Sequence, residues 1–236
     1  MRQVPHYLII GNGRVASHFK HYFSLLKLSH SSWHRKQPVS SLYQALKHTT
    51  HILLLISDHA IASFVAEHFQ QHHAVLIHFS GSLVLDNIYG AHPLMTFTHD
   101  LYDVEQYQAI PFIVDHDAYA FADLLPGLSN PHMRLHKTLK PKYHALCVLS
   151  GNFSCMLWQK LFNTLEHEFH IPKSFAFPYL TQQMNNLLNQ SNTAMTGPLV
   201  RRDTITIEKN LAALEHDPFQ SVYESFISCY EKMKQE

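Results

Sequence analysis

A glycine-rich turn between a predicted strand and a predicted helix is the feature that most constrains how this chain folds. The apolar run Tyr7–Ile10 predicts a buried strand, and apolar residues at helical spacing follow over residues 14–26. In a G-x-G-x-x-A turn the first glycine permits a sharp bend, the second lets the backbone approach a pyrophosphate, and the alanine allows close helix packing. The pattern predicts dinucleotide binding, with a plain tight turn as the alternative, at Gly11, Asn12, Gly13, Arg14, Val15 and Ala16.

The remainder of the first 136 residues alternates between short apolar runs and helical patterns. Residues 52–56 consist only of Leu and Ile, as expected of a parallel strand that is buried on both faces. Strands that alternate with helices of this length predict an α/β, doubly wound parallel sheet of the Rossmann type. Further strands are predicted at residues 28–33, 74–79, 91–95, 110–114 and 132–136.

The sequence changes character after residue 136. Residues 143–169 keep helical periodicity without a proline, and further helices are predicted at 179–188, 203–214 and 217–234. No segment of this part is typical of a strand. We therefore predict a dinucleotide-binding domain over residues 1–136 and an all-helical domain over residues 137–236.

Charge and composition exclude several classes of protein. Eighteen Lys and Arg residues balance eighteen Asp and Glu residues, so nothing provides an electrostatic footprint for nucleic acid. No apolar run approaches the roughly 20 residues of a membrane span, and no secretory pattern opens the chain, so we expect a soluble cytoplasmic protein. Charged residues make up only 15% of the chain, which favours a homo-oligomer with hidden surface.

Histidine is unusually frequent, but no ligand spacing accompanies it. The 21 histidines include no HExxH pattern and no Cys/His quartet, so we expect structural or surface use and no metal site. A His-rich metal-binding protein is the least favoured interpretation. The cysteines Cys147, Cys155 and Cys229 have no paired spacing and are interpreted as reduced thiols.

The end of the second predicted strand bears on which dinucleotide binds. NAD-binding domains carry an Asp or Glu there that holds the ribose 2′-hydroxyl, whereas this chain offers Arg35 and Lys36. Arg35 is predicted to bind a 2′-phosphate bidentately, and Trp33 or His34 to stack near the adenine. These residues favour NADP(H) over NAD(H), with a solvated basic turn as the alternative.

Polar residues at the ends of later strands converge on the edge of the sheet where open parallel sheets bind ligands. Ser57 and Asp58 follow the third strand, and Ser80 and Gly81 follow the fourth. Cofactor contact and ordinary capping are both open for these four residues. His92, at the end of the next strand, is predicted to exchange the proton that accompanies hydride transfer.

A third group of candidates begins the helical domain. Lys140, His144 and Asn152 are residue types that polarise a carbonyl or imine and relay a proton, so we predict catalytic roles for them. An exposed lysine with a packed histidine is the alternative. On a regular helix four side chains fall within about 60° of one another, with Asn152 further round: Lys140, His144, Cys147 and Gly151.

Six motifs in a fixed order give the chain a family resemblance. It resembles the Rossmann-like NADP-dependent oxidoreductases with a helical C-terminal domain of unknown function, and is similar in turn to pyrroline-5-carboxylate reductase, prephenate dehydrogenase and the phosphogluconate dehydrogenase superfamily. The resemblance implies NADP binding, a homodimer through a phosphogluconate dehydrogenase-like helical domain, and an active site between the domains. The motifs are GNGRVA, SDHAI, HFSGSL, GAHPLMTF, KPKYHAL with LSGN, and TGPLVRRD.

The resemblance also implies roles for single residues. The His92-Pro93 pair is similar to the His-Pro of prephenate dehydrogenases, whose histidine assists oxidation of a hydroxyl. Residues 33–35 depart from the usual Ser-Arg-Ser of related reductases. The remaining matches are Lys140, Tyr143 and His144 to a Lys-x-x-Tyr-His pattern, Asn152 to a Ser-Asn pattern that here is Gly-Asn, and Thr196, Gly197 and Arg201 to a loop able to receive an anionic substrate.

Two hypotheses of different classes follow. The first is an NADP-dependent oxidoreductase that transfers a hydride to or from a small carbonyl, imine or hydroxy acid bound between the domains. The second is a non-catalytic dinucleotide-sensing or scaffold protein that keeps the same fold. A polar cavity beside the cofactor favours the enzyme, and a purely apolar cleft favours the sensor.

Overall fold

The chain divides into two compact units, with the division between Met156 and Leu157. The computed structural model describes residues 4–70 and 72–235. The sequence predicts the boundary earlier, after residue 136. The difference arises because the first helix of the predicted helical domain packs on the sheet, where Lys140 pairs with Asp115.

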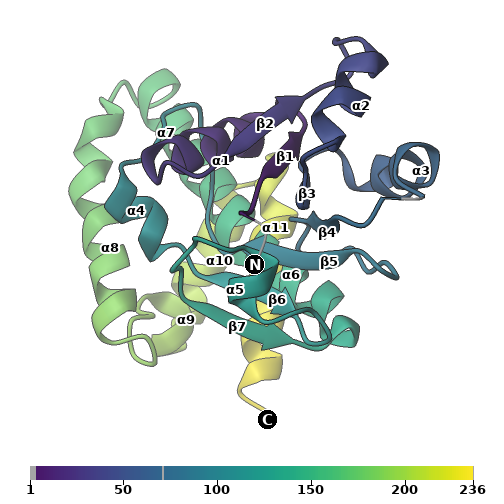
Figure 1. The fold of residues 1–236 in the computed structure, drawn as a ribbon. Helices are drawn as coiled ribbons and strands as arrows, with labels where there is room; N and C mark the ends of the chain where they lie inside the picture. The colour runs from purple at the N-terminus through teal and green to yellow at the C-terminus, as the bar shows by residue number, and fades with distance from the viewer. Residues whose placement is uncertain (1–3, 71, 236) are drawn as a thin grey trace. The chain divides into compact units, whose positions relative to one another are not determined.

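The first unit is built on a seven-stranded sheet with the order β2-β1-β3-β4-β5-β6-β7 (Figure 1). The chain moves from β1 to β2 on one side and then to β3 on the other, so the topological switch point lies between β1 and β3. Ligands bind at such points, outside the carboxyl ends of the strands. The strands are β1 (Tyr7–Ile10), β2 (His30–Trp33), β3 (His51–Leu54), β4 (Val75–His78), β5 (Tyr89–Pro93), β6 (Phe112–Asp115) and β7 (His132–Leu135).

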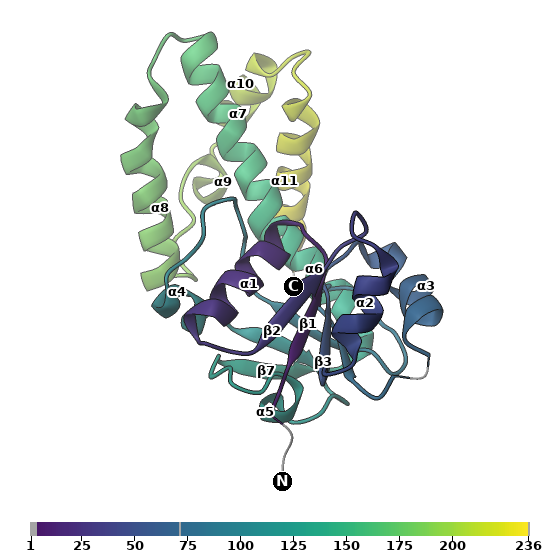
Figure 2. The same cartoon turned by 45° about the horizontal axis from the view of Figure 1, so that its top comes forward.

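Helices cover both faces of this sheet because successive strand residues point to opposite sides. In β1, Tyr7 and Ile9 join a core with α1, α4 and α5, while Leu8 and Ile10 join a core with α2 and α3. Figure 2 shows α1 on one side of β1 and the pair α2 and α3 on the other. These helices are α1 (Arg14–Leu25), α2 (Val39–Leu46), α3 (Asp58–His68), α4 (Val104–Ala109) and α5 (Phe121–Leu124).

The prediction of a Rossmann-type sheet followed by a helical region is confirmed, with one departure inside the sheet. All neighbouring strands run parallel except β5 and β6, which pair antiparallel through Ala91 opposite Val114 and His92 opposite Ile113. The carboxyl end of β6 therefore lies beside the amino end of β5. Apolar runs in a sequence do not indicate whether neighbouring strands pair parallel or antiparallel, so this reversal could not be predicted.

A continuous helical segment follows the sheet, but it is not a regular α-helix. The helix α6 (Lys140–Cys147) leads into a π-helical turn at Val148–Phe153, and α7 (Ser154–His167) continues from it. A π turn widens the helix to i→i+5 bonding and is frequent at functional sites. It changes which side chains share a face after residue 147, so the regular 100° spacing assumed for Asn152 does not apply.

Among the described residues of the second unit, the regular elements are all helices, joined by turns and loops. Its helices α7 and α8 pack through the ring pairs Trp158–Tyr179 and Phe162–Phe177. Many apolar side chains stay exposed, among them Phe175 at 74%. The homodimer expected from composition and resemblance stays a prediction. After α7, the unit contains α8 (Phe177–Asn189), α9 (Pro198–Arg201), α10 (Thr204–Ala213) and α11 (Phe219–Met233).

Candidate functional site

The glycine turn occupies the carboxyl end of β1, at the topological switch point. Gly11 has φ +131°, and a Cβ at this position would lie 2.2 Å from the carbonyl oxygen of Leu55, so only glycine fits. Gly13 precedes α1, and no atom lies within 4 Å of where its Cβ would be. The first glycine therefore makes the turn, and the second leaves open space in front of the helix N-terminus, where an anionic pyrophosphate is stabilised.

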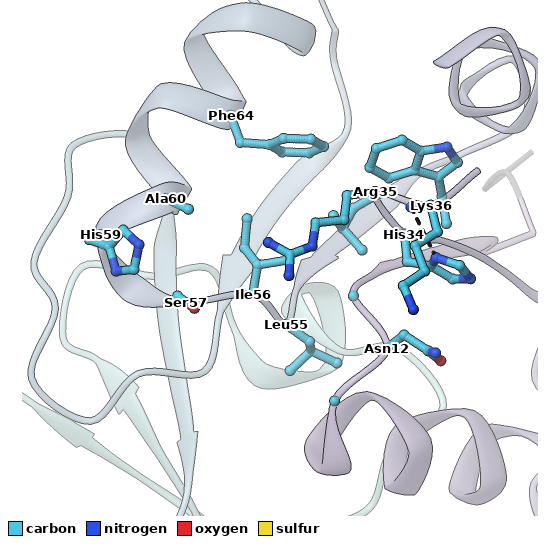
Figure 3. Close-up of a pocket in the computed structure, with 14 residues that line it drawn as sticks. Asn12, His34, Arg35, Lys36, Leu55, Ile56, Ser57, His59, Ala60 and Phe64 are labelled. Atoms are coloured by element: carbon cyan, nitrogen blue, oxygen red, sulfur yellow. Dashed lines mark hydrogen bonds between the residues drawn. The ribbon is translucent and has the colours of Figure 1, made fainter. Parts of the chain in front are cut away.

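A cavity of about 610 Å³ opens beside this turn. Arg35 and Lys36 extend their cationic ends into the space between Asn12 and Ile56 (Figure 3). His59, on the first turn of α3, also lines the cavity and was not predicted from the sequence. Of the predicted cofactor residues, this cavity brings together Gly11, Asn12, Gly13, Trp33, His34, Arg35 and Ser57.

Trp33 has a different surrounding from the one predicted. Its ring stacks on Phe64 with 5.7 Å between centroids, and its indole N–H donates to the carbonyl oxygen of Pro38. The residue is only 6% exposed. Trp33 therefore forms a fixed wall of the cavity, and the half-buried His34 and exposed Arg35 present the freer side chains.

A second cavity, of about 480 Å³, begins on the other side of Gly13. Its lining includes a hydroxyl–carboxylate contact, in which Ser80 donates to Asp58. This contact joins the ends of β4 and β3, as expected for strand ends that meet at one edge of the sheet. The predicted residues that line this cavity are Gly13, Arg14, Val15, Ala16, Asp58, Ser80 and His92.

A third cavity, of about 680 Å³, lies against α6 and the π turn. His92 and Met95 line both this cavity and the second one, so the two spaces adjoin at the end of β5. The π turn brings Ser150, Gly151 and Asn152 to the same cavity as the helix residues before it. Among the described residues that line it, none is Asp, Glu, Lys or Arg, and the polar ones are His92, Thr96, Tyr143, His144, Cys147, Ser150 and Asn152.

His92 and Tyr143 form a hydrogen bond at the junction of these cavities. The Tyr143 hydroxyl lies 2.8 Å from Nδ1 of His92, and the rings of His92 and His144 meet edge to face at 5.9 Å. Burial, followed by the nearby His144 and the charge of Lys140, lowers the pKa of His92 to about 4. Burial also raises the pKa of Tyr143 above its usual value. Near neutral pH both groups are therefore uncharged, and each can donate or accept a hydrogen bond.

Gly81 makes room for these imidazoles. A Cβ on Gly81 would lie 2.5 Å from Cδ2 of His144 and 3.1 Å from Nε2 of His92. Gly81 therefore lies against the two histidines, and its contact with the cofactor stays a prediction. Its missing side chain is what lets them approach each other.

Lys140 does not lie where the sequence predicts. Its amine donates to Oδ1 of Asp115 at 2.7 Å, and the two side chains are only 5% and 1% exposed. It is absent from the lining of the third cavity, which His144 and Asn152 share. The helix was predicted correctly, but the long side chain at its start turns toward the sheet, where a buried carboxylate is available.

The sequence reasoning missed Asp115 and its neighbour Gly90. Asp115 ends β6, and its second oxygen accepts the Gly90 N–H at 2.7 Å. A polar residue at the end of a predicted strand was the available signal, but the prediction ended that strand one residue earlier. His78, which ends β4, was also missed: it is fully buried, and neither ring nitrogen has a hydrogen-bond partner in the described part of the chain.

The three predicted substrate residues belong to the second unit. Gly197 adopts φ +102° and precedes the short helix α9, which ends at Arg201. Arg201 is exposed, and its guanidinium lies 4.0 Å from Asp203. Thr196 is also exposed. Each is accessible within its own unit, and their role in binding stays a prediction.

The described residues were also compared with the requirements for a metal site and a membrane span. Across residues 4–70 and 72–235, no three His, Cys, Asp or Glu side chains gather closely enough to hold a metal ion. In the same ranges, no helix combines the length and the apolar character that crossing a bilayer requires.

Comparison with known proteins places the chain in a family. The domain of unknown function DUF2520 matches residues 111–228, which is half of the chain. The chain belongs to the DUF2520 family. The DUF2520 match includes Asp115, Lys140, Tyr143 and the π turn, and it begins after the glycine turn. Comparison with curated protein sequences gives no match.

Solved structures share the fold of this DUF2520 chain over nearly its whole length. A Bacteroides fragilis protein provisionally named an NADP oxidoreductase is 18% identical, with a TM-score of 0.77 and coverage of 98% of this chain and 99% of that one. Pyrroline carboxylate reductase from Plasmodium falciparum, with NADP bound, is 11% identical, with a TM-score of 0.57 and 98% coverage of both chains. A reductive aminase from Aspergillus terreus, in complex with NADPH and ethyl levulinate, is 13% identical, with a TM-score of 0.62 and coverage of 98% and 94%. At these identities the likeness establishes the Rossmann-type fold with a helical region.

Proposed function

We propose that this DUF2520 protein is an NADP(H)-dependent oxidoreductase that reduces a small carbonyl or imine, or oxidises the corresponding alcohol or amine. One observation carries the proposal: His92 lines both the cavity that starts at the glycine turn and the cavity against α6. A residue in that position can exchange a proton with a substrate whose carbon faces the cofactor. The similar folds that hold NADP or NADPH support the same class of cofactor.

The residues around the glycine turn fit a dinucleotide with a 2′-phosphate. The open space in front of Gly13 suits the pyrophosphate, and Arg35 and Lys36 provide two cations beside it. NADPH bound there supplies the hydride. Aligned with the second cavity, its nicotinamide end would lie toward His92.

The residues against α6 would bind and orient the substrate. In the direction of reduction, the substrate oxygen or nitrogen takes a proton from the His92–Tyr143 pair, and solvent restores that proton afterwards. Asn152 and His144 would donate hydrogen bonds to the same atom and hold it in place. The absence of formal charge among the described residues that line this cavity favours a neutral substrate over the anionic one predicted from Arg201.

The alternative of a non-catalytic sensor predicts an apolar cleft beside the cofactor. The cavity against α6 has histidine, tyrosine, asparagine, serine and threonine side chains in its wall, which favours an enzyme. Lys140 was expected to be part of that polar wall, and its pairing with Asp115 leaves the proton chemistry to His92 and Tyr143.

Calorimetric titration with NADPH and with NADH tests the cofactor assignment. Replacing Arg35→Ala removes charge-assisted hydrogen bonds to the 2′-phosphate, so we expect the Kd for NADPH to rise about tenfold or more. The Kd for NADH should stay within about twofold, since NADH has no 2′-phosphate. Lys47→Ala, an exposed cation at the end of α2, is the matched control. If the unmodified protein binds neither nucleotide, the proposed function is wrong.

A further inference from the structure

A buried ion pair joins α6 to the sheet beneath the proposed catalytic pair. Lys140 and Asp115 meet at 2.7 Å, with side chains 5% and 1% exposed. Removing two charges from water costs about as much as their attraction returns, so a buried pair is weak evidence for a gain in stability. In some proteins a buried polar or ionic group instead specifies one arrangement of the elements that carry it.

Glycine at position 90 is what allows the pair to form. A Cβ on Gly90 would lie 2.3 Å from Nζ of Lys140 and 2.8 Å from Oδ1 of Asp115. The Gly90 N–H meanwhile donates to the other oxygen of Asp115 at 2.7 Å. The antiparallel pairing of β5 and β6 brings these two residues together, since it sets the end of β6 beside the start of β5. The cluster thus ties β5, β6 and α6 to one another.

The helix α6 and the strand β5 make a second contact, between Tyr143 and His92. Gly90 and His92 lie two residues apart on the same face of β5, about 6.6 Å along the strand. Lys140 and Tyr143 lie three residues apart on neighbouring positions of α6, about 4.5 Å along the helix. Lys140 contacts the Gly90 position, and Tyr143 bonds to His92 at 2.8 Å. Two separate contacts between the same helix and strand fix how the helix is placed along the strand.

We propose that the Asp115–Lys140 pair, made possible by Gly90, is a positioning device that holds the Tyr143 hydroxyl against His92. The proposal rests on the proposed function only for the catalytic use of His92. Asp115, Lys140 and Gly90 are positioning residues: they do not line the cavity against α6, and they act through the helix on the His92–Tyr143 contact that does. The lysine is buried against Asp115, and it transfers no proton to substrate.

Two variants disturb the pair in different ways. Asp115→Asn with Lys140→Met removes both charges while keeping a similar side-chain length and an acceptor for the Gly90 N–H. Gly90→Ala keeps every charge and places a carbon where the amine of Lys140 lies. The matched control is Asp117→Asn with Lys137→Met, the same chemical change at a nearby ion pair whose side chains are 58% and 22% exposed.

The readout is the ring nitrogen NMR spectrum of His92, followed against pH, with Tyr143→Phe as the reference for a lost hydrogen bond. We expect the unmodified protein and the control to show one tautomer, and both disturbed variants to show the mixed tautomers of Tyr143→Phe. A purely structural pair would lower stability and leave the His92 spectrum unchanged.

Either disturbed variant that folds and keeps the unmodified His92 spectrum overturns the proposal. The double variant decides if Gly90→Ala does not fold, because it leaves no unpaired charge in the buried cluster. NADPH titration of the same samples separates the two proposals. If the unmodified protein does not bind NADPH, the proposed function is wrong. The His92 spectrum tests the positioning role alone.

Discussion

The buried histidines of this protein differ in whether their ring nitrogens have hydrogen-bond partners. His18 is buried with one ring nitrogen 2.8 Å from the Tyr107 hydroxyl and the other 3.1 Å from the carbonyl oxygen of Thr98. His51 likewise contacts Thr50 and the carbonyl oxygen of Asp123. These are structural histidines, as predicted for most of the 21. His92 has one hydrogen bond and lines two cavities, and this combination is what supports the proton-transfer role proposed for it.

His78 should make the stability of the protein sensitive to acid. Burial, and next the positive charge of Lys140, lower its pKa from 6.5 to about 3. A histidine that is neutral in the fold but protonated when unfolded contributes stability above pH 6.5, which is lost as the pH falls toward 3. The free energy of unfolding should therefore drop by about 1.4 kcal/mol per pH unit in this window from His78 alone.

Urea unfolding at pH 6 and pH 4.5 measures this contribution. His78→Leu has a similar volume and no titrating group, so the difference in unfolding free energy between the two pH values should shrink. His216→Leu, at a side chain that is 91% exposed, is the control and should leave the difference as it was. An unchanged difference in His78→Leu would show that other groups cause the acid sensitivity.

At the scale of elements, the junction of β1 and α1 holds one glycine that the fold requires and a second that we propose serves cofactor binding. Gly11 is held at positive φ against the Leu55 carbonyl, whereas Gly13 has an extended backbone and open space around it. The sequence motif treats both as one signature. In the structure only Gly11 is required by its backbone conformation and close packing, whereas Gly13 has free space around it.

Alanine at each glycine tests this separation. Gly11→Ala should lower the free energy of unfolding by at least about 2 kcal/mol, through backbone strain and the clash with Leu55. Gly13→Ala should leave the free energy of unfolding within about 1 kcal/mol and weaken NADPH binding about tenfold or more, because its Cβ occupies the approach to the pyrophosphate. Thermal unfolding and calorimetry on both variants give the comparison. Equal loss of stability in both would contradict it.

At the scale of the whole molecule, α6 belongs with the sheet although its sequence is typical of the helical part. It carries Lys140 to Asp115 and Tyr143 to His92, and both contacts lie within the first unit. A fragment cut at the boundary predicted from the sequence loses both contacts. A fragment that ends at Met156 keeps them.

Two fragments test the division. Residues 1–156 should unfold with a midpoint at least about 5 °C above that of residues 1–136, since the shorter one exposes the face of β5 and β6 that α6 covers. Circular dichroism against temperature measures both midpoints, with the full chain as reference. Equal midpoints would favour the earlier boundary.

The features of the fold that could be predicted are those that depend on residues close together in the sequence. Each strand of the sheet was predicted within a few residues, because buried parallel strands are short apolar runs. The reversal of β6 and the π turn were not predicted. Both depend on pairing and bonding patterns that leave the residue types unchanged.

The residues of the candidate site likewise fall into those that the sequence predicted and those that it did not. Residues 11–16, Arg35 and His92 were predicted because strand ends of an open sheet meet at one edge, and the structure gathers them along two adjoining cavities. Asp115 and Gly90 were missed, and Lys140 was given a catalytic role. Their contact joins positions 25 and 50 residues apart, and no local pattern encodes it.

The sequence by itself determined the Rossmann-type order of strands and helices, the helical region that follows, and the turn that suits a dinucleotide. These depend on periodicity and on glycine's backbone freedom, which are properties of neighbouring residues. Only the tertiary structure decided that Lys140 faces Asp115, that Tyr143 reaches His92, and that α6 packs on the sheet. The energy of a buried charge depends on what surrounds it in space, and that surrounding exists only once distant strands have paired.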